Sequence, residues 1–96
     1  MTVANTILDQ LGGRHFIVMT GSKNFVGSDN SLSFHVGRNA KSITHVKIML
    51  NGLDLYDVSF MRIRKGSVAY SHDIQDVYFD DLQTLFTKET GLDTHL

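Results

Sequence analysis

The sequence predicts an α+β domain with a short N-terminal helix, a four- to five-stranded antiparallel meander sheet, and a C-terminal helix packed on one face of that sheet. Three observations favour this fold. Apolar residues recur with helical spacing near both ends of the chain. Between them, short segments that alternate apolar and polar residues follow one another through polar connections, as neighbouring antiparallel strands do. The length of 96 residues suits a single domain over residues 1–96.

Composition restricts the class of protein. The chain has no Cys, which excludes disulfides and thiolate metal sites. Small secreted domains often need such cross-links, so their absence favours the cytoplasm. The first residues lack the basic region and apolar run of a signal peptide, and no apolar run has the length of a membrane helix. We therefore expect a cytoplasmic protein that makes no membrane contact.

The net charge of -1 conceals an uneven distribution. Residues 14–65 carry eight Lys and Arg side chains against three acids, whereas residues 66–96 carry six acids against Lys88. The predicted sheet is therefore basic and the C-terminal part acidic. This separation favours binding to a charged partner, and it would also allow self-association into a homodimer.

The N-terminal helix is predicted over residues 3–11, where apolar side chains share one face. Thr2 can cap its first turn, and Gly12-Gly13 would end it. A strand is expected over 15–20, because this run is rich in β-branched and apolar residues. Residues 21–30 are then a polar loop in which Phe25 and Val26 turn back onto the domain. The next strand, 31–36, points Leu32, Phe34 and Val36 inward.

The central hairpin is predicted from two alternating segments, 44–50 and 56–60, on either side of Asn51-Gly52. A two-residue turn would place Asp57 on the apolar face, so face parity favours a wider loop over 51–55, with Gly52 at positive φ. The inward residues are then Val46, Ile48, Leu50, Tyr56, Val58 and Phe60. The pattern slips at Phe60-Met61, which predicts a β-bulge that turns Arg62 and Arg64 outward.

Residues 65–70 are expected to form a turn and a short last strand, with Val68 and Tyr70 pointing inward. A C-terminal helix follows, capped by Asp73 or Asp76 and ended by Gly91, with Leu92 completing a Schellman contact. Its buried stripe comprises Val77, Tyr78, Leu82, Leu85 and Phe86, with Phe79 at the edge. The last residues, DTHL, are expected to fray.

Few segments carry a chemical signature. TGSKN (20–24) has one Gly before its Lys and no helix after it, so a flexible loop is favoured over a phosphate loop. Asp73, Asp76, Asp80 and Asp81 suggest either a metal site or, as we favour, the acidic outer face of a helix. His35 and His45 point outward and are expected to be neighbours. We therefore predict no catalytic residues, no cofactor and no metal ligands, and the chain is not expected to be an enzyme.

Two charged surfaces remain as candidates for binding. Basic side chains of the sheet could follow a phosphate backbone, although outward aromatics for base stacking are not evident. The acidic helix could instead imitate nucleic acid and occupy a basic groove of another protein. The residues of the two candidate surfaces are Arg38, Lys41, Lys47, Arg62 and Arg64 on the sheet, and Asp73, Asp76 and Asp80 on the helix.

Several segments together resemble small uncharacterised proteins of bacteriophages, prophages and integrative elements. They are ILDQLGG, FIVMTGSKNF, LSF, IMLNGLDLYDVSF and FTKETGLDTHL, which extend over most of the chain. No established activity accompanies the resemblance. It implies a small phage-type protein that acts by binding a protein partner, such as an anti-CRISPR-like inhibitor of a host defence system in the bacterial cytoplasm. The alternative that the residues leave open is a nucleic-acid-binding module that uses the basic hairpin face.

Overall fold

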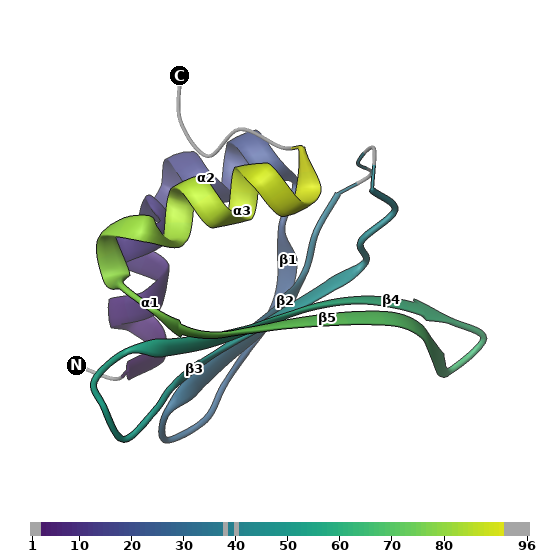
Figure 1. Cartoon of the computed structure of the whole chain (residues 1–96). Helices are drawn as coiled ribbons and strands as arrows, with labels where there is room; N and C mark the ends of the chain where they lie inside the picture. The colour runs from purple at the N-terminus through teal and green to yellow at the C-terminus, as the bar shows by residue number, and fades with distance from the viewer. Residues whose placement is uncertain (1–2, 38, 40, 92–96) are drawn as a thin grey trace.

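Two helices, five strands and a final helix follow one another along the described part of the chain. The computed structural model describes residues 3–37, 39 and 41–91. The elements are α1 (Val3–Leu11), α2 (Gly13–Thr20), β1 (Lys23–Gly27), β2 (Ser31–His35), β3 (His45–Leu50), β4 (Tyr56–Arg64), β5 (Ser67–Val77), the 3-10 turn η1 (Phe79–Asp81) and α3 (Leu82–Thr90). The strands pair in sequence order and antiparallel, so the sheet is the predicted meander (Figure 1).

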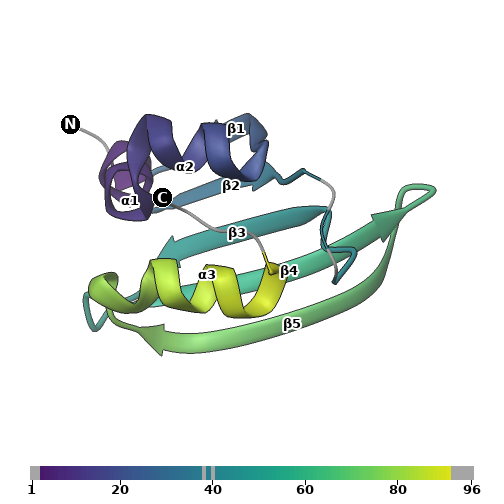
Figure 2. The ribbon, with the colours of Figure 1, turned by 90° about the horizontal axis from the view of Figure 1, so that it is seen from above.

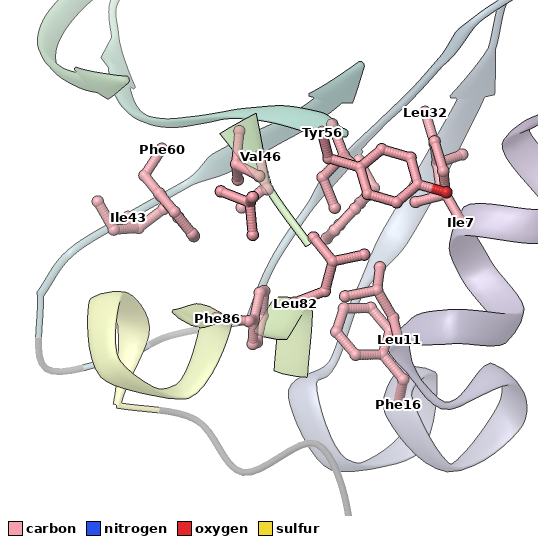
Figure 3. Packing of buried hydrophobic residues seen from close by; sticks show 14 residues of the cluster. Ile7, Leu11, Phe16, Leu32, Ile43, Val46, Tyr56, Phe60, Leu82 and Phe86 are labelled. Carbon is pink, nitrogen blue, oxygen red and sulfur yellow. The ribbon is translucent and has the colours of Figure 1, made fainter. Parts of the chain in front are cut away.

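Within residues 3–37, 39 and 41–91 the three helices lie on one face of the sheet and leave the other face uncovered (Figures 1 and 2). The α1 and α2 helices lie over β1 and β2, while α3 lies over the other half (Figure 2). Figure 3 shows the core between the two layers, where side chains from helices and strands meet. Its largest buried side chains include four rings, Phe16, Phe34, Phe60 and Phe86. The tip of the β4–β5 hairpin extends beyond the helices (Figure 2).

Residues 13–20 form helix α2, so the strand predicted over 15–20 is wrong. Phe16 and Thr20, four residues apart, are buried, whereas Val18 between them is 73% exposed. The Thr20 hydroxyl donates to the Phe16 carbonyl over 2.6 Å, a bond that only a helical turn permits at this spacing. Consecutive apolar residues hid the helical period, and packing against α1 and the sheet outweighed the strand preference of Ile17 and Val18.

The segment predicted as a loop over 21–30 contains the edge strand β1. Phe25 packs on Phe34, with ring centroids 5.3 Å apart, so this residue turns back onto the domain as predicted. Val26 does not, because it is 63% exposed. Gly21 ends α2 with φ 66 and donates its backbone N–H to the Ile17 carbonyl. An abrupt end of this kind frees the chain to reverse into β1.

The central hairpin has the predicted five-residue loop. Leu50 pairs with Tyr56, so residues 51–55 connect β3 to β4 and the inward set stays on one face. The positive φ falls on Asp54 rather than on Gly52, so that part of the prediction is wrong. The loop is built around Asn51, whose side-chain carbonyl accepts the backbone N–H groups of Leu53 and Leu55. An asparagine can organise a turn in this way without help from glycine.

The bulge predicted at Phe60-Met61 does not form, since β3 and β4 pair continuously from His45–Met61 to Leu50–Tyr56. Arg62 and Arg64 therefore follow Phe60 on the helix-bearing face, beyond the helices. The irregularities lie in β5, which has an extra residue between its pairs with Arg62 and Ile63 and another between its pairs with Tyr56 and Val58. Such bulges are concentrated in edge strands, because a bulge there discourages the strand from pairing with another chain.

The β5 strand is far longer than the predicted 65–70 segment, and it contains Asp73 and Asp76, which were expected to cap the helix. Val68 and Tyr70 are exposed rather than inward. The helix begins only after η1 and buries Leu82 and Phe86, while Tyr78 and Phe79 remain exposed. Gly91 ends α3 at φ 79, as predicted. The roles predicted for Thr2, Leu92 and the final DTHL lie outside the described residues.

Candidate functional site

The sheet face that no helix covers, here called the open face, is defined by strand pairing. Directly paired residues of antiparallel strands share a face. One row across the sheet holds His35, His45, Met61 and Ser71, and the next row holds Ser33, Lys47, Ser59 and Asp73. Met49 pairs with Asp57 in a third row. The open face thus combines methionine, imidazole, hydroxyl and charged groups over four neighbouring strands.

His35 and His45 pair directly with each other in one of these rows. They are neighbours on the outward face, as the sequence predicted. Their ring centroids are 3.8 Å apart and their planes meet at 63°. The Nδ1 of His45 lies 2.7 Å from the Thr44 hydroxyl, and the Nδ1 of His35 lies 3.5 Å from the Asn24 amide nitrogen. Burial, followed by the charge of His35, lowers the pKa of His45 below 6.5. Protonation of His45 is therefore disfavoured in the folded protein.

Two lysines flank the imidazole pair on the open face. Lys23 pairs with His35, and Lys47 is two residues from His45 on the same strand. Both side chains are exposed. Within the described part of the chain no carboxylate lies within salt-bridge distance of either lysine. The open face therefore carries two lysines on β1 and β3, with Asp57 on β4 and Asp73 on β5.

A second surface lies on the helix-bearing side, where the β4–β5 hairpin extends beyond α3. There a hollow of about 260 Å³ is lined by Lys41, Ile43, Arg62, Tyr70 and Glu89. The Arg62 guanidinium lies over the Tyr70 ring, 5.6 Å from its centroid. Its Nε donates to the Ser42 carbonyl over 3.2 Å and its Nη2 to the Lys41 carbonyl over 2.9 Å. We call this the Arg62 hollow.

A neighbouring hollow of about 310 Å³ holds the other arginine of β4. It is lined by Val36, Gly37, Asn39, Ser42, Ile43, Thr44 and Arg64. Asn39 shapes the loop that forms its wall, because its amide nitrogen donates to the carbonyls of Gly37 and Ile43. The side-chain oxygen of Asn39 accepts the backbone N–H groups of Lys41 and Ile43. Ile43 lines both hollows, so Arg62 and Arg64 lie on either side of one short loop.

The structure therefore brings together only part of the predicted binding set. Lys41 lies in the loop before β3, and Arg62 and Arg64 line the two hollows beside that loop, whereas Lys47 lies on the open face. Arg38 lies outside the described residues. The predicted acidic helix face does not form, because Asp73 and Asp76 are in β5, Asp80 is in η1, and α3 has Glu89 as its acid beside Lys88. The spacing i, i+3 and i+7 holds only within a helix.

Asp76 has a structural environment at the opposite end of the sheet from the hollows. The Asn51 amide donates to Asp57 over 3.0 Å and to Asp76 over 2.9 Å, and the Asp76 N–H donates to Asp57. Two carboxylates thus share one amide. No cluster of three or more metal-binding side chains occurs among the residues that the structure describes. The acidic residues that suggested a metal site are accordingly spread over different surfaces.

Tyr70 is the member of the Arg62 hollow that sequence reasoning missed, because it was assigned to the core. The signal that could identify it is the direct cross-strand pair that it forms with Arg62. That pair depends on the extra residue in β5, which no local pattern marks. No helix within the described ranges is long and apolar enough to cross a membrane. No family model, curated protein or solved structure matches the chain.

Proposed function

We propose that this chain is a non-enzymatic binding protein that acts through a protein partner, which it contacts with its open face. The observation that carries the proposal is the uncovered sheet surface around His35 and His45, where Lys23 and Lys47 have no carboxylate partner within the described residues. Hydrogen-bonded neighbouring strands offer a rigid platform that loses little entropy on binding. Met49 and Met61 add adaptable apolar contacts of the kind that protein-binding surfaces use.

The charge of the open face selects the partner. Lys23 on β1 and Lys47 on β3 favour a protein that presents acidic side chains, because complementary charge speeds encounter and fixes orientation. The resemblance to phage proteins makes a component of a host defence complex the first partner to test. On this proposal the chain is an inhibitor of the anti-CRISPR type, working by occupation of a surface.

The experiment is a pull-down with purified host defence complexes, followed by an affinity measurement. Wild-type protein is expected to retain a partner, Lys47→Glu to lose it, and Lys88→Glu to keep it. Lys88 is an exposed lysine of α3, on the other side of the sheet, so it controls for net charge. Binding that Lys47→Glu leaves unchanged, or no binding at all, contradicts the proposal. Light scattering identifies the case in which the partner is a second copy.

A second candidate function is nucleic-acid binding, favoured by the position of Arg62 and Arg64 on either side of one loop. Phosphate neutralisation by such side chains is strongly salt-dependent. Retardation of DNA or RNA at low salt, weakened in the double variant Arg62→Ala with Arg64→Ala, would support it. Equal retardation by wild type and double variant would remove it.

A further inference from the structure

We propose that the Arg62 hollow is a binding site for a phosphate group, with Arg62 and Lys41 as its cations and Tyr70 as the platform that holds the arginine. The site is on the opposite side of the sheet from the open face. The phosphate site therefore does not depend on the protein partner proposed above. It would give the alternative nucleic-acid function a defined contact, but a phosphate group on another molecule could bind there as well.

Arg62 is fixed before any ligand arrives. Two of its N–H groups donate to the carbonyls of Lys41 and Ser42, and its plane is supported by the Tyr70 ring. A guanidinium has five N–H donors, so those not used by the loop remain available. Because the side chain is already ordered, little conformational entropy is lost when an anion binds. The fork of remaining donors matches the oxygen spacing of phosphate.

The charge of the hollow favours an anion. Within the described residues no carboxylate forms an ion pair with Arg62 or Lys41. Glu89 lines the hollow, but its Oε2 lies 3.3 Å from the Nδ1 of His72. Two cations thus face one carboxylate that has another neighbour. The negative charge of Glu89 would disfavour a bound anion. Removal of that charge should therefore strengthen phosphate binding, whereas removal of Arg62 or Lys41 should weaken it.

The size of the hollow is consistent with a phosphate and part of the molecule that carries it. It measures about 260 Å³ and has an apolar side at Ile43 and the Tyr70 ring. Phosphate of this kind comes from a free nucleotide or from a nucleic-acid strand. The chemistry at Arg62 is the same for both, so the ligand series has to distinguish them.

The test is a titration followed by NMR, observing the Arg62 Nε–H and the backbone amides of Lys41 and Tyr70. The probes are inorganic phosphate, a nucleoside monophosphate with its parent nucleoside, and a short single-stranded oligonucleotide, all at constant ionic strength in chloride. We expect shifts at these groups with every phosphate probe and none with the nucleoside. Tighter binding of the oligonucleotide identifies a strand as the source, and equal binding identifies a free phosphate ligand.

Substitutions test whether the Arg62 hollow is the site at which phosphate binds. Arg62→Ala is expected to weaken phosphate binding by about tenfold, the factor for loss of one charge-assisted hydrogen bond. Lys41→Ala keeps the backbone carbonyl that Arg62 uses and is expected to weaken binding while preserving the loop. Glu89→Gln is expected to tighten binding, and Lys47→Ala on the open face to leave it unchanged. Absence of shifts with all phosphate probes, or equal weakening by Lys41→Ala and Lys47→Ala, overturns the proposal.

Discussion

His35 and His45 face each other across two neighbouring strands, with their ring centroids 3.8 Å apart at the centre of the open face. The contact places two imidazole rings side by side on neighbouring strands. Burial contributes most to the lowered pKa of His45, and the charge of His35 adds to it. The proposed binding surface therefore changes charge as the pH falls.

Protein stability should decrease as the pH falls through this titration. The pKa of His45 is lower in the folded than in the unfolded protein, so the unfolded state binds the proton more readily. The stabilising contribution is complete above pH 6.5 and is lost as the pH falls from 6.5 towards the folded pKa. His45→Gln should reduce the slope of unfolding free energy against pH, whereas Val18→Ala, a change at an exposed position without a titratable group, should not. Urea titrations at several pH values check this, and equal slopes for both variants contradict it.

Asn51 should be essential to the central hairpin. Its side chain donates to Asp57 and Asp76 and accepts from Leu53 and Leu55. Asn51→Ala removes these hydrogen bonds and is expected to cost about 2 kcal/mol of unfolding free energy, since each contributes roughly 0.5–1.5 kcal/mol. The control is Leu53→Ala, because Leu53 is 71% exposed on the same loop. Urea unfolding that gives the two variants the same stability would refute a structural role for Asn51.

Phe86 and Phe79 offer a matched pair for the core. Phe86 is 2% exposed and packs edge-on against Phe16, with ring centroids 4.9 Å apart. Phe86→Ala is expected to cost about 3–5 kcal/mol, the range for a buried phenylalanine. Phe79 is 60% exposed, so Phe79→Ala should cost far less. Thermal unfolding of both variants measures the difference, and similar losses would mean that η1 packs on the core.

Alternating segments made the central part of the fold predictable from sequence. In β2, β3 and β4 one face is buried and the other is not, so the period of two is visible and parity fixed the loop at residues 51–55. The two edge strands of the sheet were harder to predict from sequence. Edge strands β1 and β5 bury little, and their exposed residues show no periodic signal that distinguishes them from loops or helix. Asp73 and Asp76 were assigned to a helix for this reason.

The candidate site was predictable only in part. Arg62 and Arg64 were identified because they stand out in charge at the end of a clear strand. The face of the sheet on which these two arginines lie was not identified, because the irregularities in strand pairing are in β5 rather than at Phe60-Met61. Tyr70 was missed because a β-bulge depends on the partner strand, and a single strand's sequence does not reveal it. Long-range pairing thus decides the composition of the Arg62 hollow.

Val18 provides a direct test of the largest correction, helix α2 in place of a strand. In a helix the side chain of Val18 points to solvent, and it is 73% exposed. Alanine has a higher helix propensity than valine, so Val18→Ala is expected to leave stability unchanged or raise it by up to about 0.7 kcal/mol. In a half-buried strand the same change would lose side-chain packing and strand propensity and would destabilise the protein. Ile17→Ala is the control, because Ile17 packs against the core and its truncation should be destabilising. Urea unfolding curves for the two variants decide, and a clear loss of stability in Val18→Ala would contradict the helix.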